Sequence, residues 1–166
     1  EPVETEFVRF LFRLEPQARP AVLLAAALAA RKAREGHVCL QLDQYAGRPA
    51  FADGKGADGE GLEKWKLPAL DEWMIQLGQS DLVGPPGTHR PLILERRGKL
   101  YIQKYFEYEL RLARGLVGKA SFDYENLDFK VLRDGLNRYF PTDGSGEPDC
   151  QKVAALAALI RKLAVI

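Results

Sequence analysis

The stretch PAVLLAAALAARKAR, residues 20–34, decides the fold class of this chain. Alanine and leucine are the strongest helix formers, and proline is tolerated at a first helical position because its missing N–H would be unsatisfied there anyway. Basic residues at 31–34 complement the helix dipole, and Gly36 supplies a stop. Because the helix is apolar on most sides near its start, we expect it to lie at the centre of a mainly α-helical domain.

Two further helices are predicted around this one. The first carries an apolar stripe at helical spacing, made of Phe7, Phe10, Leu11 and Leu14. Val8 and Phe12 lie off that stripe, so this helix has more apolar surface than one core contact requires, and we expect both residues to contribute to partner docking. The other helix starts at Pro68, and its apolar residues recur at i, i+3, i+4 and i+7 as Leu70, Trp73, Met74 and Leu77.

A β-hairpin is predicted over residues 91–103. Alternating apolar positions flank a turn at 96–99, and the pair must pack on helices because a lone two-stranded unit is marginal. Arg96, Arg97 and Lys99 at its tip are candidates for contact with a DNA phosphate backbone, or else form a solvated turn whose charges protect a sheet edge. Residues 37–42 are expected to form a short extended piece or a turn into a helix, and 47–61 a flexible surface loop.

The segment Tyr105–Val117 is predicted to be a helix with two apolar faces, ended by Gly118. Such a helix needs two neighbours, or one neighbour and a partner protein, so Tyr105 and Phe106 are further docking candidates. Three roles stay open for the aromatic residues of this region: core packing, an interface anchor and base stacking. These residues are Tyr101, Tyr105, Phe106 and Tyr108. A later helix over 127–139 is expected to be capped by Ser121 or Asp123.

The last residues of the sequence combine a helix with an apolar run. A helix opens at Asp149, and its apolar residues fall on one face as Val153, Leu156, Leu159 and Ile160. Leu163–Ile166 is expected to be the start of a buried strand. Because chain termini are usually polar, we interpret the sequence as a fragment cut before a glycine-rich loop.

Composition limits the function classes. A net charge of +1 over 166 residues gives no strong global attraction to nucleic acid or acidic lipid. Cys39 and Cys150 are expected to be reduced thiols, and no histidine or cysteine spacing suits a metal. No apolar stretch is long enough to span a bilayer, so we expect a cytoplasmic protein. No catalytic constellation is present.

Four groups of segments follow one another in the order of one known family. They are Gly36–Leu40; Pro91–Leu94 with Gly98–Ile102 and Tyr105–Glu109; Tyr139–Pro141; and Gln151–Leu156 with Leu163–Ile166. Together they resemble the N-terminal region of RecD, the alpha subunit of exodeoxyribonuclease V (the RecBCD helicase–nuclease). The resemblance spans most of the chain.

The resemblance implies a domain plan and a function. Residues 1–118 would form a helical docking domain that binds the RecC and RecB subunits, and 119–166 would begin a P-loop motor domain truncated before the Walker A loop. The parent protein would be an ATP- and Mg-dependent 5′-to-3′ DNA helicase in double-strand break repair, and the fragment itself non-catalytic. Gln151 would contact adenine in the full-length protein only. Two alternatives stay open: a module that guides single-stranded DNA to the motor, and a small helical adaptor unrelated to helicases.

Overall fold

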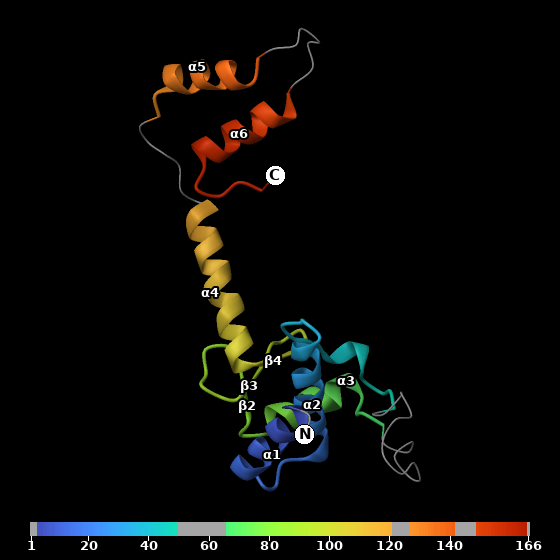
Figure 1. The fold of residues 1–166 in the computed structure, drawn as a ribbon. Coiled ribbons are helices and arrows are strands. Elements are labelled where there is room, and N and C mark those ends of the chain that lie inside the picture. The colour runs from blue at the N-terminus through green and yellow to red at the C-terminus, as the bar shows by residue number, and fades with distance from the viewer. Residues whose placement is uncertain (1–2, 50–65, 121–126, 142–148, 166) are drawn as a thin grey trace. The chain divides into compact units, whose positions relative to one another are not determined.

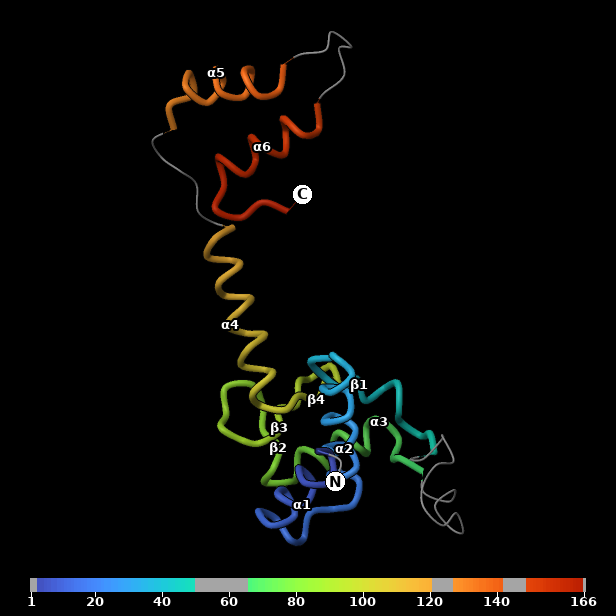
Figure 2. Tube along the Cα trace, in the orientation of Figure 1, coloured from blue at the N-terminus to red at the C-terminus, as the bar shows by residue number. Residues whose placement is uncertain are grey.

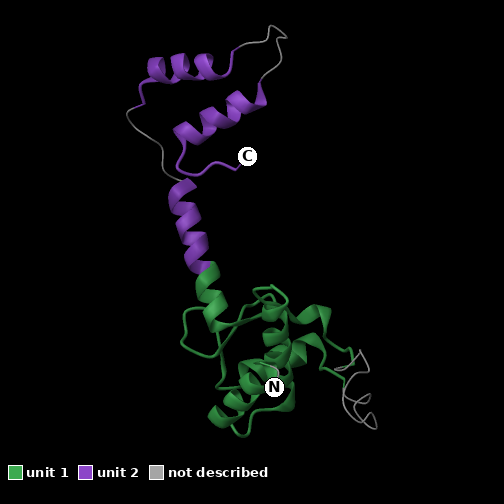
Figure 3. Ribbon diagram, in the orientation of Figure 1, with its two compact units in different colours: residues 1–109 green, residues 110–166 purple. Residues whose placement is uncertain are grey.

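The structure, a computed structural model, describes residues 3–49, 66–120, 127–141 and 149–165. Within these ranges it contains six α-helices and one four-stranded sheet (Figure 1). The prediction of a mainly helical fold with a small β element is therefore confirmed. The chain divides into two compact units, residues 1–109 and 110–166 (Figure 3).

Helix α2, Pro20–Arg34, is the centre of the first unit. It contacts α1, α3, β1 and β4 (Figure 2), as its apolar start predicts. Proline occupies its first turn, and Gly36 follows the helix with φ of +90°, a conformation that favours glycine. Its small buried side chains let the neighbouring elements approach closely; they are Val22, Ala25, Ala26, Ala29 and Ala30.

Two helices pack on α2. In α1, Val3–Leu14, Leu11 is fully buried and Phe7 packs on the core. In α3, Leu70–Gly78, Trp73 and Leu77 are fully buried, as predicted. The indole Nε1 of Trp73 donates a hydrogen bond to the carbonyl oxygen of Ala21 at 3.0 Å, so α3 is fixed to the first turn of α2 by a polar contact as well as by packing.

The predicted hairpin is present as β3, Leu92–Leu94, and β4, Lys99–Ile102, paired antiparallel with Ile93 opposite Tyr101. The sheet is larger than expected, because β1, Leu40–Gln41, pairs antiparallel with β4, and β2, Val83–Gly84, pairs parallel with β3. The strand order is β1-β4-β3-β2. A short 3-10 helix, Leu42–Gln44, follows β1, so both readings of the segment 37–42 are partly correct.

Helix α4 spans Gln103–Ala120. The prediction that Gly118 ends it is wrong, because the helix continues for two more residues. A glycine ends a helix when it adopts a left-handed conformation, and Gly118 is not among the glycines with positive φ in the described part of the chain. The unit boundary falls inside α4, after Glu109; the functional division of the chain near Gly118 stays a prediction.

The second unit contains α5, Phe129–Tyr139, and α6, Cys150–Ile160, which contact each other. The cap of α5 is Asp128, whose carboxylate accepts from the backbone N–H groups of residues 130 and 131. The prediction of a cap at Ser121 or Asp123 is wrong because Asp128 lies directly before the first turn; those two residues lie outside the described ranges. Asp149 caps α6 in the same way, as expected from the opening of that helix.

The expected strand at the end of the sequence is not formed over Leu163–Val165, and Val165 is 95% exposed. A strand needs a hydrogen-bonding neighbour, and the described residues of this unit offer none there. Ile166 lies outside the described residues, as does most of the predicted loop 47–61. None of the described helices combines the length and the apolar character that a membrane crossing requires.

Candidate protein-docking surface

Helix α1 carries an uncovered apolar stripe beside its buried face. Val3, Phe10 and Leu14 are seven and four residues apart, which places them on one side of an α-helix. They are 70%, 51% and 55% exposed, whereas Leu11 on the neighbouring face is fully buried. The predicted stripe is therefore buried only in part, because α2 covers only the portion around Phe7 and Leu11.

The opposite flank of α1 carries the two residues predicted to dock a partner. Phe12 is 49% exposed, and Val8 is half-buried. The helix thus presents apolar side chains on both sides of Leu11. We call Val3, Phe10 and Leu14 together with Phe12 the α1 surface. Aromatic residues of this kind are enriched at protein interfaces, so the chemistry of this surface suits a protein partner.

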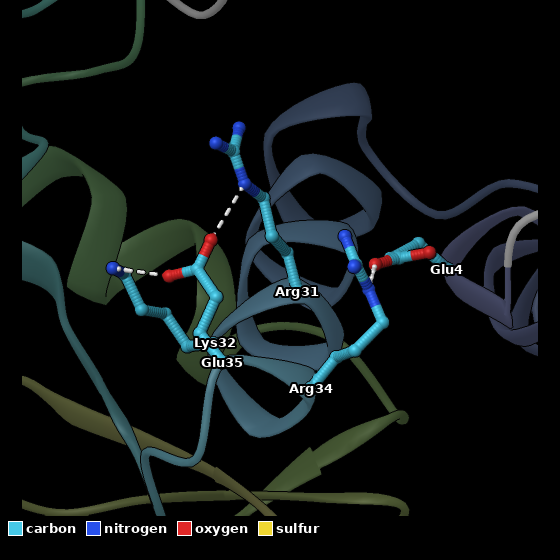
Figure 4. Close-up of polar contacts among 5 residues, drawn as sticks. All are labelled: Glu4, Arg31, Lys32, Arg34 and Glu35. Atoms are coloured by element: carbon cyan, nitrogen blue, oxygen red, sulfur yellow. Dashed lines mark hydrogen bonds and ion pairs between the residues drawn. The ribbon is translucent and has the colours of Figure 1, made fainter.

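One ion pair joins the start of α1 to the end of α2 (Figure 4). Arg34 Nε lies 2.7 Å from Glu4 Oε1. The hydrogen bond from Arg34 holds the pKa of the Glu4 carboxyl below its ordinary value, and a backbone hydrogen bond adds to the shift. This contact joins residues 30 positions apart in the sequence, so it orients α1 against α2.

A second set of charges closes α2. The carboxylate of Glu35 accepts from Lys32 Nζ at 2.7 Å and from Arg31 Nε at 3.0 Å (Figure 4). These contacts lower the pKa of Glu35, with Lys32 contributing most, and the same hydrogen bond raises the pKa of Lys32. These charges lie at the surface, with Lys32 partly covered, so they orient side chains locally and add little stability.

The other end of α1 is joined to the segment after α3. Ser80 Oγ donates to Glu15 Oε2 at 2.6 Å, and the backbone N–H of Leu82 donates to the same oxygen at 3.3 Å. Ser80 is 7% exposed. The α1 surface therefore lies on a helix whose two ends are each held by contacts to a distant part of the unit.

Helix α4 carries a second uncovered apolar surface. No residue of α4 is buried, and the apolar residues of both predicted faces are exposed from position 110 onward. Their exposed fractions are 37% for Leu110, 63% for Leu112, 41% for Leu116 and 64% for Val117. The need of this helix for a second neighbour or a partner protein stays a prediction.

The aromatic residues at the start of α4 belong mainly to packing. Tyr101 is 2% exposed, and its ring meets the ring of Phe106 edge-on with centroids 5.3 Å apart. Tyr105 and Phe106 are half-buried, and Tyr108 is 50% exposed with Lys104 Nζ 5.6 Å from its ring centroid. The four positions therefore do not form an open stacking platform, since the ring of Tyr101 is buried.

Three of the remaining predicted site residues, Arg96, Arg97 and Lys99, do come together. They line one groove at the hairpin tip; Arg96 and Arg97 are exposed and Lys99 is half-buried. The side chain of Gln151 is exposed in the first turn of α6, and its backbone N–H donates to Asp149 Oδ1 at 2.9 Å. Its contact with adenine stays a prediction.

The two cysteines differ in environment. Cys39 is half-buried and Cys150 is exposed, and neither forms a disulfide. Burial raises the pKa of the Cys39 thiol and also that of the Tyr101 hydroxyl. Nowhere in the described ranges do three or more histidine, cysteine, aspartate or glutamate side chains gather in a way that would hold a metal ion.

The sequence pattern did not mark Phe10 and Leu14 as exposed, because they share an apolar stripe with Leu11, which is fully buried. The sequence did carry a signal, because Val3 lies seven residues before Phe10 on the same side of the helix. The apolar positions of α1 together span a wider arc than one neighbouring helix covers. An arc wider than its contact leaves apolar side chains in water.

Comparison with known proteins identifies the family of this chain. No curated protein matches the sequence. A family model described as RecBCD enzyme subunit RecD, N-terminal domain, matches residues 1–101. The matched range contains α1, α2, α3 and the sheet through most of β4. The chain therefore belongs to the RecD family and contains the N-terminal domain of that RecBCD enzyme subunit.

Proposed function

We propose that the first unit of this chain is a docking domain that attaches a RecD-type subunit to the RecC and RecB subunits of exodeoxyribonuclease V. The observation that carries the proposal is the α1 surface, where Val3, Phe10 and Leu14 are each at least half exposed. Membership in the family supports the choice of partners, since the family is named as a subunit of the RecBCD enzyme.

The energetics favour a protein partner for this surface. Removing a large apolar side chain from water is worth about 1.5–3 kcal/mol when the burial is complete. A few such residues at the centre of an interface commonly dominate its affinity. Phe10, Phe12 and Leu14 are each about half exposed, so a partner that covers them gains part of that energy without unfolding α1.

The proposed function of the parent protein rests on the membership of the chain in the RecD family. We infer that the parent is an ATP- and Mg-dependent 5′-to-3′ DNA helicase acting in double-strand break repair, and that residues 119–166 begin its motor domain. An apolar groove of about 760 Å³ beside α5, lined by residues that include Val131, Tyr139 and Leu159, supports this because a larger fold would cover it. Gln151, exposed at the start of α6, is the proposed adenine contact. The docking domain itself is non-catalytic.

Co-purification with RecB and RecC tests the docking role. The double variant Phe10→Lys/Leu14→Lys places two charges on the α1 surface and should abolish recovery of the chain with tagged RecC. Phe12→Lys tests the other flank and should weaken recovery. Ile75→Lys on α3 is the matched control, because Ile75 is also exposed, at 60%; it should co-purify like the unmodified chain. Undiminished recovery of both Phe10→Lys/Leu14→Lys and Phe12→Lys would reject the α1 surface.

A further inference from the structure

The first unit contains a charged groove that shares no residue with the α1 surface. It lies between the turn that follows β2 and the tip of the β3–β4 hairpin, and its volume is about 660 Å³. Its lining residues are Pro85, Pro86, Leu94, Glu95, Arg96, Arg97 and Lys99. Three cations therefore face one carboxylate, while the whole chain carries a net charge of only +1.

The cations of this groove are available to a ligand. Among the described residues, no hydrogen bond or ion pair occupies the side chain of Arg96 or Arg97. Arg90 beside the same turn differs, because its guanidinium bonds the carbonyl oxygen of Asp81 at 2.6 Å and lies 3.3 Å from its carboxylate. The charges of Arg96 and Arg97 at the hairpin tip are thus not neutralised by an ion pair within the described part of the chain, whereas the charge of Arg90 is.

Both walls of the groove are formed before any ligand arrives. In the hairpin, Gly98 has φ of +74° and is buried, and Glu95 N donates to Lys99 O at 2.9 Å. In the opposite turn, Thr88 bonds the carbonyl oxygen of Pro85 through both its backbone N–H, at 3.2 Å, and its hydroxyl, at 2.8 Å. A preformed groove pays little ordering entropy on binding.

The lining chemistry favours a phosphate polymer over a peptide. Proline has no backbone N–H, so Pro85 and Pro86 offer no donor to a peptide main chain. The lining has no aromatic ring, so it lacks the stacking platform typical of sites for single strands. What it offers is two guanidinium forks and an ammonium group, which match phosphate oxygens. We propose that this groove binds the phosphate backbone of duplex DNA, without sequence preference.

Fluorescence anisotropy with a labelled duplex tests the proposal. The chain should bind a mixed-sequence duplex of about 20 base pairs, with an affinity that falls steeply between about 50 and 200 mM salt. Arg96→Gln/Arg97→Gln should weaken binding about tenfold and lower the salt slope by about 2, one per lost phosphate contact. The control Arg13→Gln/Arg19→Gln removes the same charge from other exposed positions and should change binding little.

Three results would overturn the proposal. They are the absence of duplex binding at low salt, equal losses in the two double variants, and binding of a polyglutamate peptide that the duplex does not displace. The last would identify an acidic-peptide site. Arg96→Lys/Arg97→Lys keeps the charge and should retain most of the binding, which guards against a folding defect. Because the α1 surface is unchanged in these variants, recovery with RecC should be normal whatever their DNA binding.

Discussion

Ser80 Oγ donates a hydrogen bond of 2.6 Å to Glu15 Oε2, which joins the residue after α1 to the turn that follows α3. The same carboxylate oxygen accepts from the backbone N–H of Leu82. Because Ser80 is 7% exposed, water cannot easily replace the contact. The position of α1, and with it the surface proposed to bind a partner, depends on this small polar group.

Ser80→Ala should lower the free energy of unfolding by about 1–2 kcal/mol, because it removes one hydrogen bond to a charged group and leaves that group less well satisfied. Urea denaturation measures the change. Thr88→Ala removes a hydroxyl that bonds Pro85 in an exposed turn and should stay within about 0.5 kcal/mol. Equal effects of the two substitutions would show that the Glu15 contact adds nothing.

Two glycine substitutions should act in opposite directions. Gly98→Ala puts a side chain where φ is +74°, and should cost about 1–2 kcal/mol of stability. Gly78→Ala lies at the end of α3 with no atom near the added methyl group, and should gain about 0.4–1 kcal/mol. Thermal unfolding of both variants checks the signs, and stabilisation by Gly98→Ala would contradict the hairpin geometry.

The Glu4–Arg34 ion pair should make stability depend on acid pH. The pKa of Glu4 is lowered by Arg34 from its ordinary value of 4.5. Its contribution is therefore fully present above pH 4.5 and is lost as the pH falls through the lower pKa of the folded state. Glu4→Gln and Arg34→Gln should each flatten the fall of the melting temperature below that pH. If the melting temperature of both variants fell with pH in parallel with that of the unmodified chain, the ion pair would not contribute to stability.

The two thiols should react at different rates. Burial raises the pKa of Cys39, so less of it is thiolate near neutral pH, whereas Cys150 is exposed. Titration with a thiol-specific disulfide reagent should show a fast phase that Cys150→Ser removes and a slow phase that Cys39→Ser removes. A single fast phase for both cysteines would show that Cys39 is not shielded.

The local patterns predicted most of the first unit. The alanine-rich run around Val22, the Trp73 and Leu77 spacing and the hairpin alternation are signals that short segments carry in themselves. The strands β1 and β2 could not be predicted from local patterns. A strand of two residues, such as Val83–Gly84, is too short to show alternation, and it forms only by pairing with a strand that lies elsewhere in the sequence. The strand expected at Leu163 fails for the related reason that no strand among the described residues pairs with it.

The candidate sites were predicted in part. Phe12 is exposed, and Arg96 and Arg97 lie together, as their positions in the sequence suggested. The exposure of Phe10 and Leu14 was not predicted, because periodicity shows how wide an apolar arc is but not how much of it a neighbour covers. That share depends on where α2 crosses α1, which only the tertiary structure shows.

The most direct test of the docking role is the dissociation constant between this chain and purified RecC, measured by isothermal titration calorimetry. Phe10→Lys/Leu14→Lys should raise it by at least about tenfold, since central apolar residues carry much of an interface's binding energy. Ile75→Lys should leave it unchanged. Equal dissociation constants for the double variant and the unmodified chain would contradict the assignment of the α1 surface as the docking site.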